Sequence, residues 1–450
     1  MTTSITSSLD QQRSEWVEAA WSQLSRDSIR DLNRDLVDLH SPMGDERALA
    51  EWLVGRMRDS GISSSLQPID ARSANAVGRY GSASDGPSLL LYAPIDTHIA
   101  ADEEVDLPWV GRGLRDDMRP SGYLNEIGDV VGLGASNPKA LVAAQLAALE
   151  AVVRAGVPLR GEVVAAFCGG GMPYHSEPGY PRQGVGMGSG VFHLVTHGVT
   201  ADFGLICKPG YQVTWEEAGL AWFKITTSGP LMYAGLPHDM PGYRNAIADI
   251  GQVAVALESW LPEYAKANSS GLVEPQGALG AIRGGHPSRT AIPTASAELY
   301  VDLRLTPRMT PLDAQRQLEK QIDILRAADP GLDVTVEMIA AYPSASTDRD
   351  HWIVRSTTRA WEAVEGREHP AEPDPSSGQT DASLIRNLGI PLARVGCPWN
   401  EKTPAEWSAG IGGMGVSHIP DVEKVARIVV HTIIDSCTRA RDDLLVGGTS

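Results

Sequence analysis

The sequence predicts an α/β protein in which a larger domain with a mixed sheet is interrupted by a smaller α+β domain. The chain has 450 residues, more than the roughly 250–300 residues at which a single hydrophobic core stops growing. Apolar strand-like runs alternate with helical patterns in the first part of the chain, as they do in α/β sheets. This texture changes after residue 217 and returns after residue 340, so we expect domain segments at 1–217, 218–340 and 341–450.

Helical periodicity dominates the N-terminal region, from Gln11 to Ser60. Apolar residues recur there every three or four positions, with a break at Ser41–Gly44 and a new start at Glu46. Two helices are therefore expected ahead of the first strand.

Four apolar runs with strand character come next, and an alanine-rich helix at Lys139–Ala155 separates the second from the third. The runs are Ser88–Tyr92, Val130–Gly132, Gly161–Phe167 and Phe203–Cys207. In open α/β sheets ligands bind beyond the carboxyl ends of the strands. The turn after the first run carries Pro94, Asp96 and His98, so this turn is expected to lie at a functional site.

The interrupting segment has the element order of a small β-α-β-β-α-β unit. Its expected elements are a strand near Ala221–Thr227, a helix at Ala246–Trp260, a strand at Ala297–Leu303, a helix at Leu312–Ala327 and a strand at Leu332–Ile339. The α/β texture then resumes with a helix at Ile353–Val364, the segment Ile385–Val395 and a closing helix from Asp421.

Composition excludes several classes of partner. A net charge of −18 with a pI near 5.0 argues against nucleic acid, which requires a basic face. No apolar run approaches the ~20 residues that span a bilayer, and the polar N-terminus lacks the pattern of a signal peptide, so we expect a cytoplasmic protein without a membrane partner. The four cysteines are widely spaced, which indicates neither a thiolate zinc site nor a disulfide framework.

Seven motifs then occur in an order typical of one enzyme family. They are Leu36–Glu46, Ala93–Thr97, Gly132–Lys139, Gly229–Tyr233 with Asn245–Ile247, Val301–Arg304, Ser377–Ala382, and His418 ahead of Pro420 and Glu423. In these motifs the chain resembles the dinuclear zinc amidohydrolases that include acetylornithine deacetylase, succinyl-diaminopimelate desuccinylase, aminoacylase and carboxypeptidase G. The resemblance implies a phosphorylase/hydrolase-like catalytic domain, a ferredoxin-like lid that mediates homodimerisation, and hydrolysis of a C–N bond in a small carboxylate-bearing molecule.

The resemblance also implies that most of the family's metal ligands are replaced. Pro94 stands at the position of its first histidine ligand, and Asn137 at that of its bridging aspartate. Glycines after Cys168 take the place of its two adjacent glutamates, and Lys208 that of a later acidic ligand. Only His418 keeps its family identity. Without carboxylate bridging, the repulsion between two cations is uncompensated, so we expect no dinuclear zinc and no cofactor, although a single divalent metal is an alternative.

Five residues are candidates for catalysis in such a rebuilt site. Asp96 and His418 are candidates for proton transfer, and Lys208 supplies positive charge for an oxyanion. His175 and Glu177 lie in a long loop rich in Gly and Pro. These two residues would act as a base or, with Asp96, His98 and His418, as ligands of one relocated metal. The simpler interpretation is that they are solvent-exposed loop residues without a catalytic role.

Candidates for substrate binding come from both domains. Asn137 either contacts substrate or caps the following helix, and Gly170 and Gly171 form either a plain turn or a nest of N–H groups for an oxyanion. Thr380, in the Ser377–Ala382 loop, corresponds to a residue that receives a substrate carboxylate. Cys168 is a possible nucleophile, but a buried inert thiol is the favoured interpretation.

Three candidates lie in the expected lid. Tyr233 takes the place of a family histidine that stabilises the oxyanion across the dimer, with a core tyrosine as the alternative. Asn245 matches a family position. Arg304 is suited to bidentate binding of a carboxylate, but Asp302 offers it a structural ion pair.

Three functions follow from these residues. The leading hypothesis is a hydrolase of an amide or cyclic amide that works without dinuclear zinc. The alternatives are a mononuclear metal hydrolase with relocated ligands and a non-catalytic carboxylate-binding protein. Lyase or isomerase chemistry on the same scaffold is a further possibility.

Overall fold

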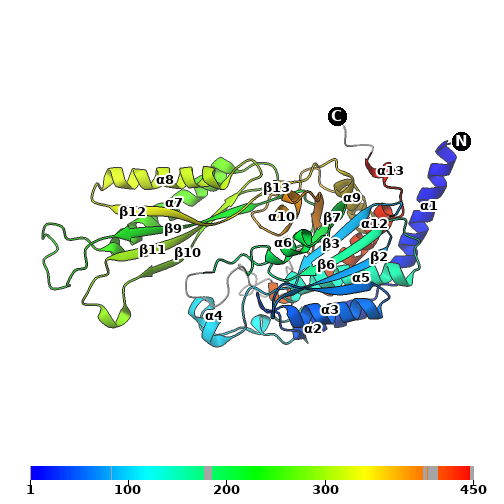
Figure 1. The fold of residues 1–450 in the computed structure, drawn as a ribbon, viewed down its shortest axis with the longest axis horizontal. Helices are drawn as coiled ribbons and strands as arrows, with labels where there is room; N and C mark the ends of the chain where they lie inside the picture. Colours follow the sequence, from blue (N-terminus) through cyan, green and yellow to red (C-terminus); the bar gives the residue numbers. More distant parts are fainter. Residues whose placement is uncertain (1, 83, 177–184, 399–402, 404–413, 446–450) are drawn as a thin grey trace. The chain divides into compact units, whose positions relative to one another are not determined.

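The computed structural model describes residues 2–82, 84–176, 185–398, 403 and 414–445, and it forms two compact units (Figure 1). The larger unit contains Met1–Trp215, Thr347–Pro373 and Thr380–Ser450, and the smaller unit contains Glu216–Ser346 and Asp374–Gln379. The predicted end of the insertion at residue 340 falls inside strand β12 (Asp333–Tyr342), because this strand stays paired with β9 (Gly219–Ser228) as far as Tyr342.

A six-stranded mixed sheet forms the centre of the larger unit, in the order β1-β2-β6-β3-β7-β14. The strands β6, β3, β7 and β14 are parallel to one another, whereas the pairs β1-β2 and β2-β6 are antiparallel. Their bounds are β1 Ser63–Pro68, β2 Ala74–Gly81, β3 Ser88–Pro94, β6 Glu162–Cys168, β7 Phe203–Cys207 and β14 Leu392–Val395. The predicted mixed α/β sheet is confirmed, although β1 and β2 were not predicted, because the serine-rich β1 lacks an apolar alternation.

Both faces of this sheet are covered, so the central strands are apolar throughout. Leu89 and Leu91 of β3 pack into one hydrophobic cluster, and Leu90 and Tyr92 into another on the opposite face. The first cluster includes residues of α2 Arg26–Asp38, α3 Arg47–Asp59, α5 Leu141–Arg154, α9 Trp352–Glu365 and α12 Ile419–Cys437, and the second includes residues of α6 Ser189–Thr196 and α10 Ala382–Asn387.

The N-terminal region contains one helix more than predicted. Helix α1 covers Thr2–Trp21 and α2 begins at Arg26, because Ser25 adopts an extended conformation and accepts a hydrogen bond from the Ser28 N–H as an N-cap. The apolar repeat continues across this break, so periodicity alone did not reveal it. No helix in the described ranges has the length and apolar character required to cross a membrane.

A second, small sheet in the larger unit combines distant segments in the order β15-β5-β4. It contains the predicted Val130 run, which therefore lies outside the central sheet. The bounds here are β4 Tyr123–Leu124, β5 Val130–Val131 and β15 Val416–Ser417, and the remaining short helices of the unit are α4 Glu103–Val110, η1 Asp116–Met118, η2 Ala135–Ala140 and α13 Asp442–Leu445.

The smaller unit has the predicted ferredoxin-like arrangement. Its four antiparallel strands lie in the order β10-β11-β9-β12, and β9 alternates between buried and partly exposed residues, as expected for a sheet with one covered face. The elements are β9, α7 Ala246–Asn268, β10 Gly277–Gly284, η3 Pro287–Arg289, β11 Ser296–Leu305, α8 Pro311–Ala328 and β12, and a short pair joins β8 Glu216–Glu217 to β13 Ala345–Ser346.

Candidate functional site

Three neighbouring parallel strands of the central sheet bring the main candidates to one edge. Strand β3 lies between β6 and β7 and is parallel to both. Asp96 follows β3, the glycines 169–171 follow β6, and Lys208 follows β7. The carboxyl ends of parallel strands meet at the same edge of a sheet, which is where ligands bind in open α/β folds.

Asp96 is fully buried, and both of its carboxylate oxygens fix the glycine loop. Oδ1 accepts a hydrogen bond from the Gly171 N–H at 2.9 Å and Oδ2 from the Met172 N–H at 2.8 Å. Burial raises the pKa of Asp96, while these two N–H groups and the charge of Lys208 act in the opposite direction. Asp96 therefore acts as an anchor of this loop rather than as a proton-transfer group exposed to substrate.

The glycine loop uses its N–H groups internally. Gly169 N–H donates to Asn75 Oδ1 at 3.2 Å, and Gly170 N–H donates to Glu46 Oε1 at 3.1 Å. With the two bonds to Asp96, all four consecutive N–H groups from 169 to 172 have side-chain acceptors. The predicted oxyanion nest at Gly170 and Gly171 is therefore wrong, because buried acceptors of the protein itself already occupy these donors.

Glu46 is a site residue that the sequence reasoning missed. Its fully buried carboxyl group accepts from the Gly44 N–H at 2.6 Å, from the Gly170 N–H and from the Ser73 hydroxyl. Burial, together with the charge of Asp96, raises the pKa of Glu46 to about 7. A Cβ at position 169 would lie 2.9 Å from the Glu46 carboxyl carbon, so glycine there makes room for Glu46.

Lys208 and Asn137 form a buried polar pair. Lys208 Nζ lies 3.3 Å from Asn137 Oδ1, and each residue is only 5% exposed. Asn137 has φ −130° and ψ 115°, an extended backbone inside η2, and its Nδ2 contacts Met414 Sδ at 3.5 Å. Lys208 engages the amide oxygen of Asn137, which favours a role in the site over a role as helix cap.

His418 is held by a second residue that the sequence reasoning missed. The β15–β5 pairing places Ser417 opposite Val130, so that His418 and Asp129 become neighbours. His418 Nδ1 lies 2.7 Å from Asp129 Oδ1, and the Asp129 side chain is 2% exposed. A buried carboxylate on Nδ1 fixes the ring and leaves Nε2 as the nitrogen for proton transfer. Strand β15 also packs against η2, which carries Asn137.

Asp381 was also missed, although it lies in a motif quoted from the sequence. It is fully buried and accepts a hydrogen bond from the Tyr92 hydroxyl. The neighbouring Thr380 hydroxyl accepts from the Ala382 N–H at 3.2 Å, at the start of α10. Cys168 is fully buried, and burial raises the pKa of its thiol well above the usual range, with Asp381 and Asp96 adding to the effect. The inert interpretation of Cys168 is the one that this environment favours.

Four of the five residues considered for a relocated metal lie in the described part of the chain. Within the described ranges, no group of three or more His, Cys, Asp or Glu side chains is placed to hold a metal ion. His98 is largely buried, and burial lowers its pKa to about 4. His175 is partly buried in the loop after Met172, and Glu177 lies outside the described residues.

The three lid candidates lie in the smaller unit and make contacts of their own. Tyr233 is 60% exposed, so the alternative of a core tyrosine is wrong. Asn245 Oδ1 accepts from the N–H groups of residues 247 and 248 and thereby caps α7. Arg304 pairs with Asp302 at 3.0 Å through one terminal nitrogen, as the sequence interpretation allowed.

Comparison with known proteins identifies the family to which the chain belongs. Residues 90–432 match the sequence model of Peptidase family M20/M25/M40. The chain belongs to this peptidase family. It is therefore a hydrolase by family and fold, and the resemblance predicted from the sequence motifs is confirmed.

Solved structures agree on the fold. A tripeptidase from Staphylococcus aureus is 18% identical, with a TM-score of 0.66 over 93% of this chain and 100% of that chain. Human carnosine dipeptidase 1 is 12% identical, with a TM-score of 0.67 over 94% and 99%. An amidase of the hydantoinase/carbamoylase family from Burkholderia multivorans is 14% identical, with a TM-score of 0.59 over 93% and 99%. Both peptidases and amidases thus share this fold.

The dinuclear zinc implied by the sequence resemblance does not fit the residues present. Pro94 offers no donor atom, and the glycines 169–171 offer no carboxylate. Where a bridging carboxylate would stand, Asn137 Oδ1 accepts a hydrogen bond from an ammonium group. A positive charge at that place opposes cation binding by direct repulsion.

Proposed function

We propose that this protein hydrolyses a C–N bond, of an amide or cyclic amide, in a small carboxylate-bearing molecule without the dinuclear zinc of its family. The contact between Lys208 Nζ and Asn137 Oδ1 carries this proposal, because it supplies a buried positive charge at the expected metal position. The family's peptidase and amidase relatives support the reaction class. The unpaired buried cysteines of the described chain support the predicted cytoplasmic location.

In the proposed reaction, His418 acts first as a general base. Its Nε2 takes a proton from water, and the resulting hydroxide attacks the substrate carbonyl carbon. Asp129 holds the proton on Nδ1 and stabilises the imidazolium that forms. His418 then returns the proton to the leaving nitrogen as the C–N bond breaks. General acid–base catalysis of this kind contributes about 10²–10⁴-fold.

Lys208 is the proposed oxyanion stabiliser. A preorganised charge in a water-excluded site stabilises the negative oxygen of the tetrahedral intermediate more strongly than the same charge in water. The Lys208 side chain is nearly fully buried, and Asn137 orients its ammonium group. A carbonyl that is already electrophilic suits such a site, since metal polarisation is worth several kcal/mol.

Arg304 of the smaller unit and Thr380 of the larger unit each remain, taken separately, a proposed contact for a carboxylate. Asp302 engages one terminal nitrogen of Arg304, so the other edge of the guanidinium is suited to a second carboxylate. The Thr380 hydroxyl accepts a backbone N–H, and its own proton is suited to donation. Tyr233, being exposed, is suited to a contact with a partner molecule.

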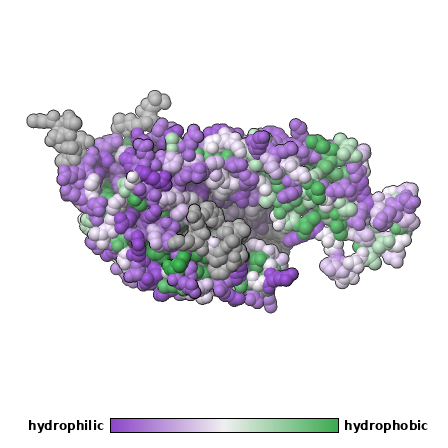
Figure 2. Space-filling view, turned by 180° about the vertical axis from the view of Figure 1, so that it is seen from behind, coloured by the Kyte–Doolittle hydropathy of each residue, from purple (hydrophilic) through white to green (hydrophobic). Residues whose placement is uncertain are grey.

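We further propose a homodimer formed through the smaller unit. Strand β10 is an edge strand of its sheet and is mostly exposed, and exposed edges pair readily with a second chain. Apolar side chains accompany this edge, including Ile282 at 58% exposure and Ile247 and Val255 of α7 at 45% and 71%. Figure 2 shows apolar residues gathered on the surface of the smaller unit.

Metal analysis and paired variants test the proposed function. The purified protein is expected to contain less than one zinc per chain and to keep its amidase activity in chelator. Lys208→Met and His418→Ala are each expected to lower kcat by about 10²–10³-fold. Two tightly bound metal ions, with activity lost on chelation, would contradict the proposal. Carboxylate binding without turnover would instead identify a non-catalytic binding protein.

A further inference from the structure

We propose that a cavity between α1, α9 and α12 of the larger unit binds a small organic anion, a carboxylate or phosphate monoester carrying a flat apolar group. The cavity has a volume of about 480 Å³, within the size range of ligand pockets. None of its lining residues belongs to the candidate active site, so this inference is independent of the proposed reaction.

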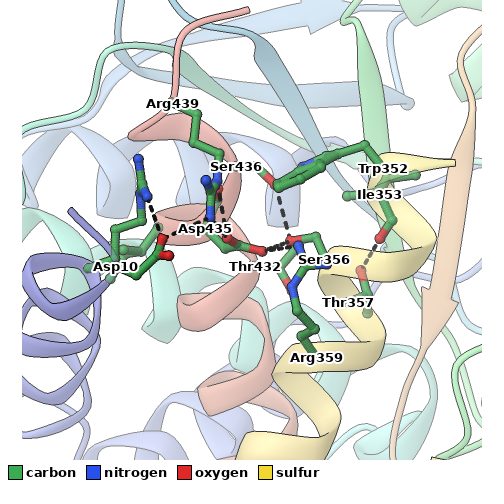
Figure 3. A network of polar contacts seen from close by, with 12 residues as sticks. Asp10, Trp352, Ile353, Ser356, Thr357, Arg359, Thr432, Asp435, Ser436 and Arg439 are labelled. Carbon is green, nitrogen blue, oxygen red and sulfur yellow. Dashed lines mark hydrogen bonds and ion pairs between the residues drawn. The ribbon is translucent and has the colours of Figure 1, made fainter. Parts of the chain in front are cut away.

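Three arginines and three carboxylates line the cavity. Two of the carboxylates, Asp10 and Glu18, are exposed, whereas Asp435 is buried. Asp435 lies between Arg359 of α9 and Arg439 after the end of α12, as Figure 3 shows. The Arg359 nitrogen lies 2.6 Å and the Arg439 nitrogen 2.8 Å from its two carboxylate oxygens. Burial would raise the pKa of Asp435, but the two guanidinium groups outweigh burial and hold it below its usual value. One carboxylate therefore faces two permanent cations.

Arg13 of α1 adds a third guanidinium to this wall. Its side chain is 13% exposed, whereas its partner Asp10 is 56% exposed and therefore largely solvated. Burial and the charge of Arg439 lower the pKa of Arg13, and they outweigh the opposing effect of Asp10 and Asp435, so these carboxylates compensate its positive charge only in part. A bound anion would relieve this crowding, and arginine groups have the planar geometry that carboxylates and phosphates match.

The remaining walls of the cavity are suited to the apolar group of the ligand. Val17, Trp21 and Ala363 line the cavity beside the arginines. His431 also lines it, and its Nδ1 is buried with no hydrogen-bond partner in the described part of the chain. A purely structural ion-pair cluster would account for the arginines but not for this unsatisfied nitrogen or for the open volume beside it.

Benzoate and phenyl phosphate are suitable probes, because each combines a ring with one anionic group. We expect calorimetry to detect binding of at least one probe to the full-length protein, and the tighter probe identifies a carboxylate or a phosphate as the recognised group. Arg13→Gln is expected to weaken that binding by at least about tenfold. Ala363→Trp, at an exposed helix position, keeps the charges and is expected to fill the cavity and abolish binding.

Matched controls separate the site from general charge effects. Arg316→Gln removes an arginine with the same spacing to its aspartate partner, in α8 of the smaller unit, and Ala327→Trp adds the same bulk to an exposed position of that helix. Both controls are expected to bind the probe as the wild type does. Absence of binding of both probes at about 10 mM, or unchanged affinity in either Arg13→Gln or Ala363→Trp, overturns the proposal.

Discussion

The buried carboxyl group of Glu46 gives the sharpest test of the electrostatics at the glycine loop. Burial and Asp96 raise the pKa of Glu46 from its ordinary 4.5 to about 7 in the folded protein. The Glu46 carboxyl group therefore binds its proton more tightly in the folded state than in the unfolded state. The contribution of Glu46 to stability is fully present below pH 4.5 and is lost as the pH rises through about 7.

The size of this loss follows from the shift. A difference of 2.5 between 4.5 and about 7 corresponds to about 3.5 kcal/mol at about 1.4 kcal/mol per pKa unit. Glu46→Gln keeps the shape and the acceptor oxygen but cannot ionise. Relative to the wild type, this variant is expected to gain about 2.5 kcal/mol of this in free energy of unfolding between about pH 5 and about pH 8.

Thermal unfolding followed across this pH range measures the effect. At about 2 °C per kcal/mol for a large unit, the melting temperature of Glu46→Gln should rise by about 5 °C relative to the wild type between the two pH values. Glu150→Gln is the matched control. Glu150 is buried too, but its hydrogen bonds from Arg56 at 2.7 and 2.9 Å overcome burial and lower its pKa, so this variant should lose stability equally at both pH values. A Glu46→Gln difference that is constant with pH would refute the assignment.

Three further variants test separate parts of the site. Asp129→Asn should lower kcat by about 10–100-fold with little change in KM, because His418 loses the carboxylate that holds its Nδ1; an unchanged kcat would show that His418 works without it. Gly169→Ala should cost about 1–3 kcal/mol in unfolding free energy, since its Cβ would lie 2.9 Å from Glu46. Asn245→Ala should cost about 1 kcal/mol through loss of the α7 cap; an unchanged KM would assign Asn245 to the cap alone.

Apolar periodicity predicted most of the fold, because core packing selects for it. The run Phe203–Cys207 matches β7 residue for residue, and the order of the smaller unit followed from alternating strands and helices. The features that were not predicted are those that leave no apolar pattern in the sequence. Strand β1 is rich in serine, and the break between α1 and α2 depends on the cap formed by Ser25 rather than on an apolar pattern.

The candidate site was predicted less completely, because single residues in sequence do not show which donor meets which acceptor. Asp96 was assigned to proton transfer from its place after β3, but its two oxygens are used by loop N–H groups. Asp129 carried no signal beyond preceding a short strand, since only the β15–β5 register brings it to His418. Glu46 and Asp381 lie within motifs quoted from the sequence. Their hydrogen-bond partners, Gly170 and Tyr92, are more than a hundred residues away along the chain, so the motifs alone did not reveal these contacts.

The replaced positions make physical sense only when they are considered together. If a side chain stood at position 169, its Cβ would collide with the Glu46 carboxyl group, and a Cβ at 171 would lie 2.7 Å from Asp381 Oδ2. The glycines therefore let two buried carboxyl groups approach the loop from the chain's own helices. Lys208 adds a buried positive charge near Asp96, which lowers the cost of ionising that carboxyl group. Restoring one family ligand, for example by Pro94→His, would leave the ammonium of Lys208 and the neutral Asn137 in place. A single reversion should therefore not restore zinc binding, whereas removal of Lys208 is a necessary first step toward it.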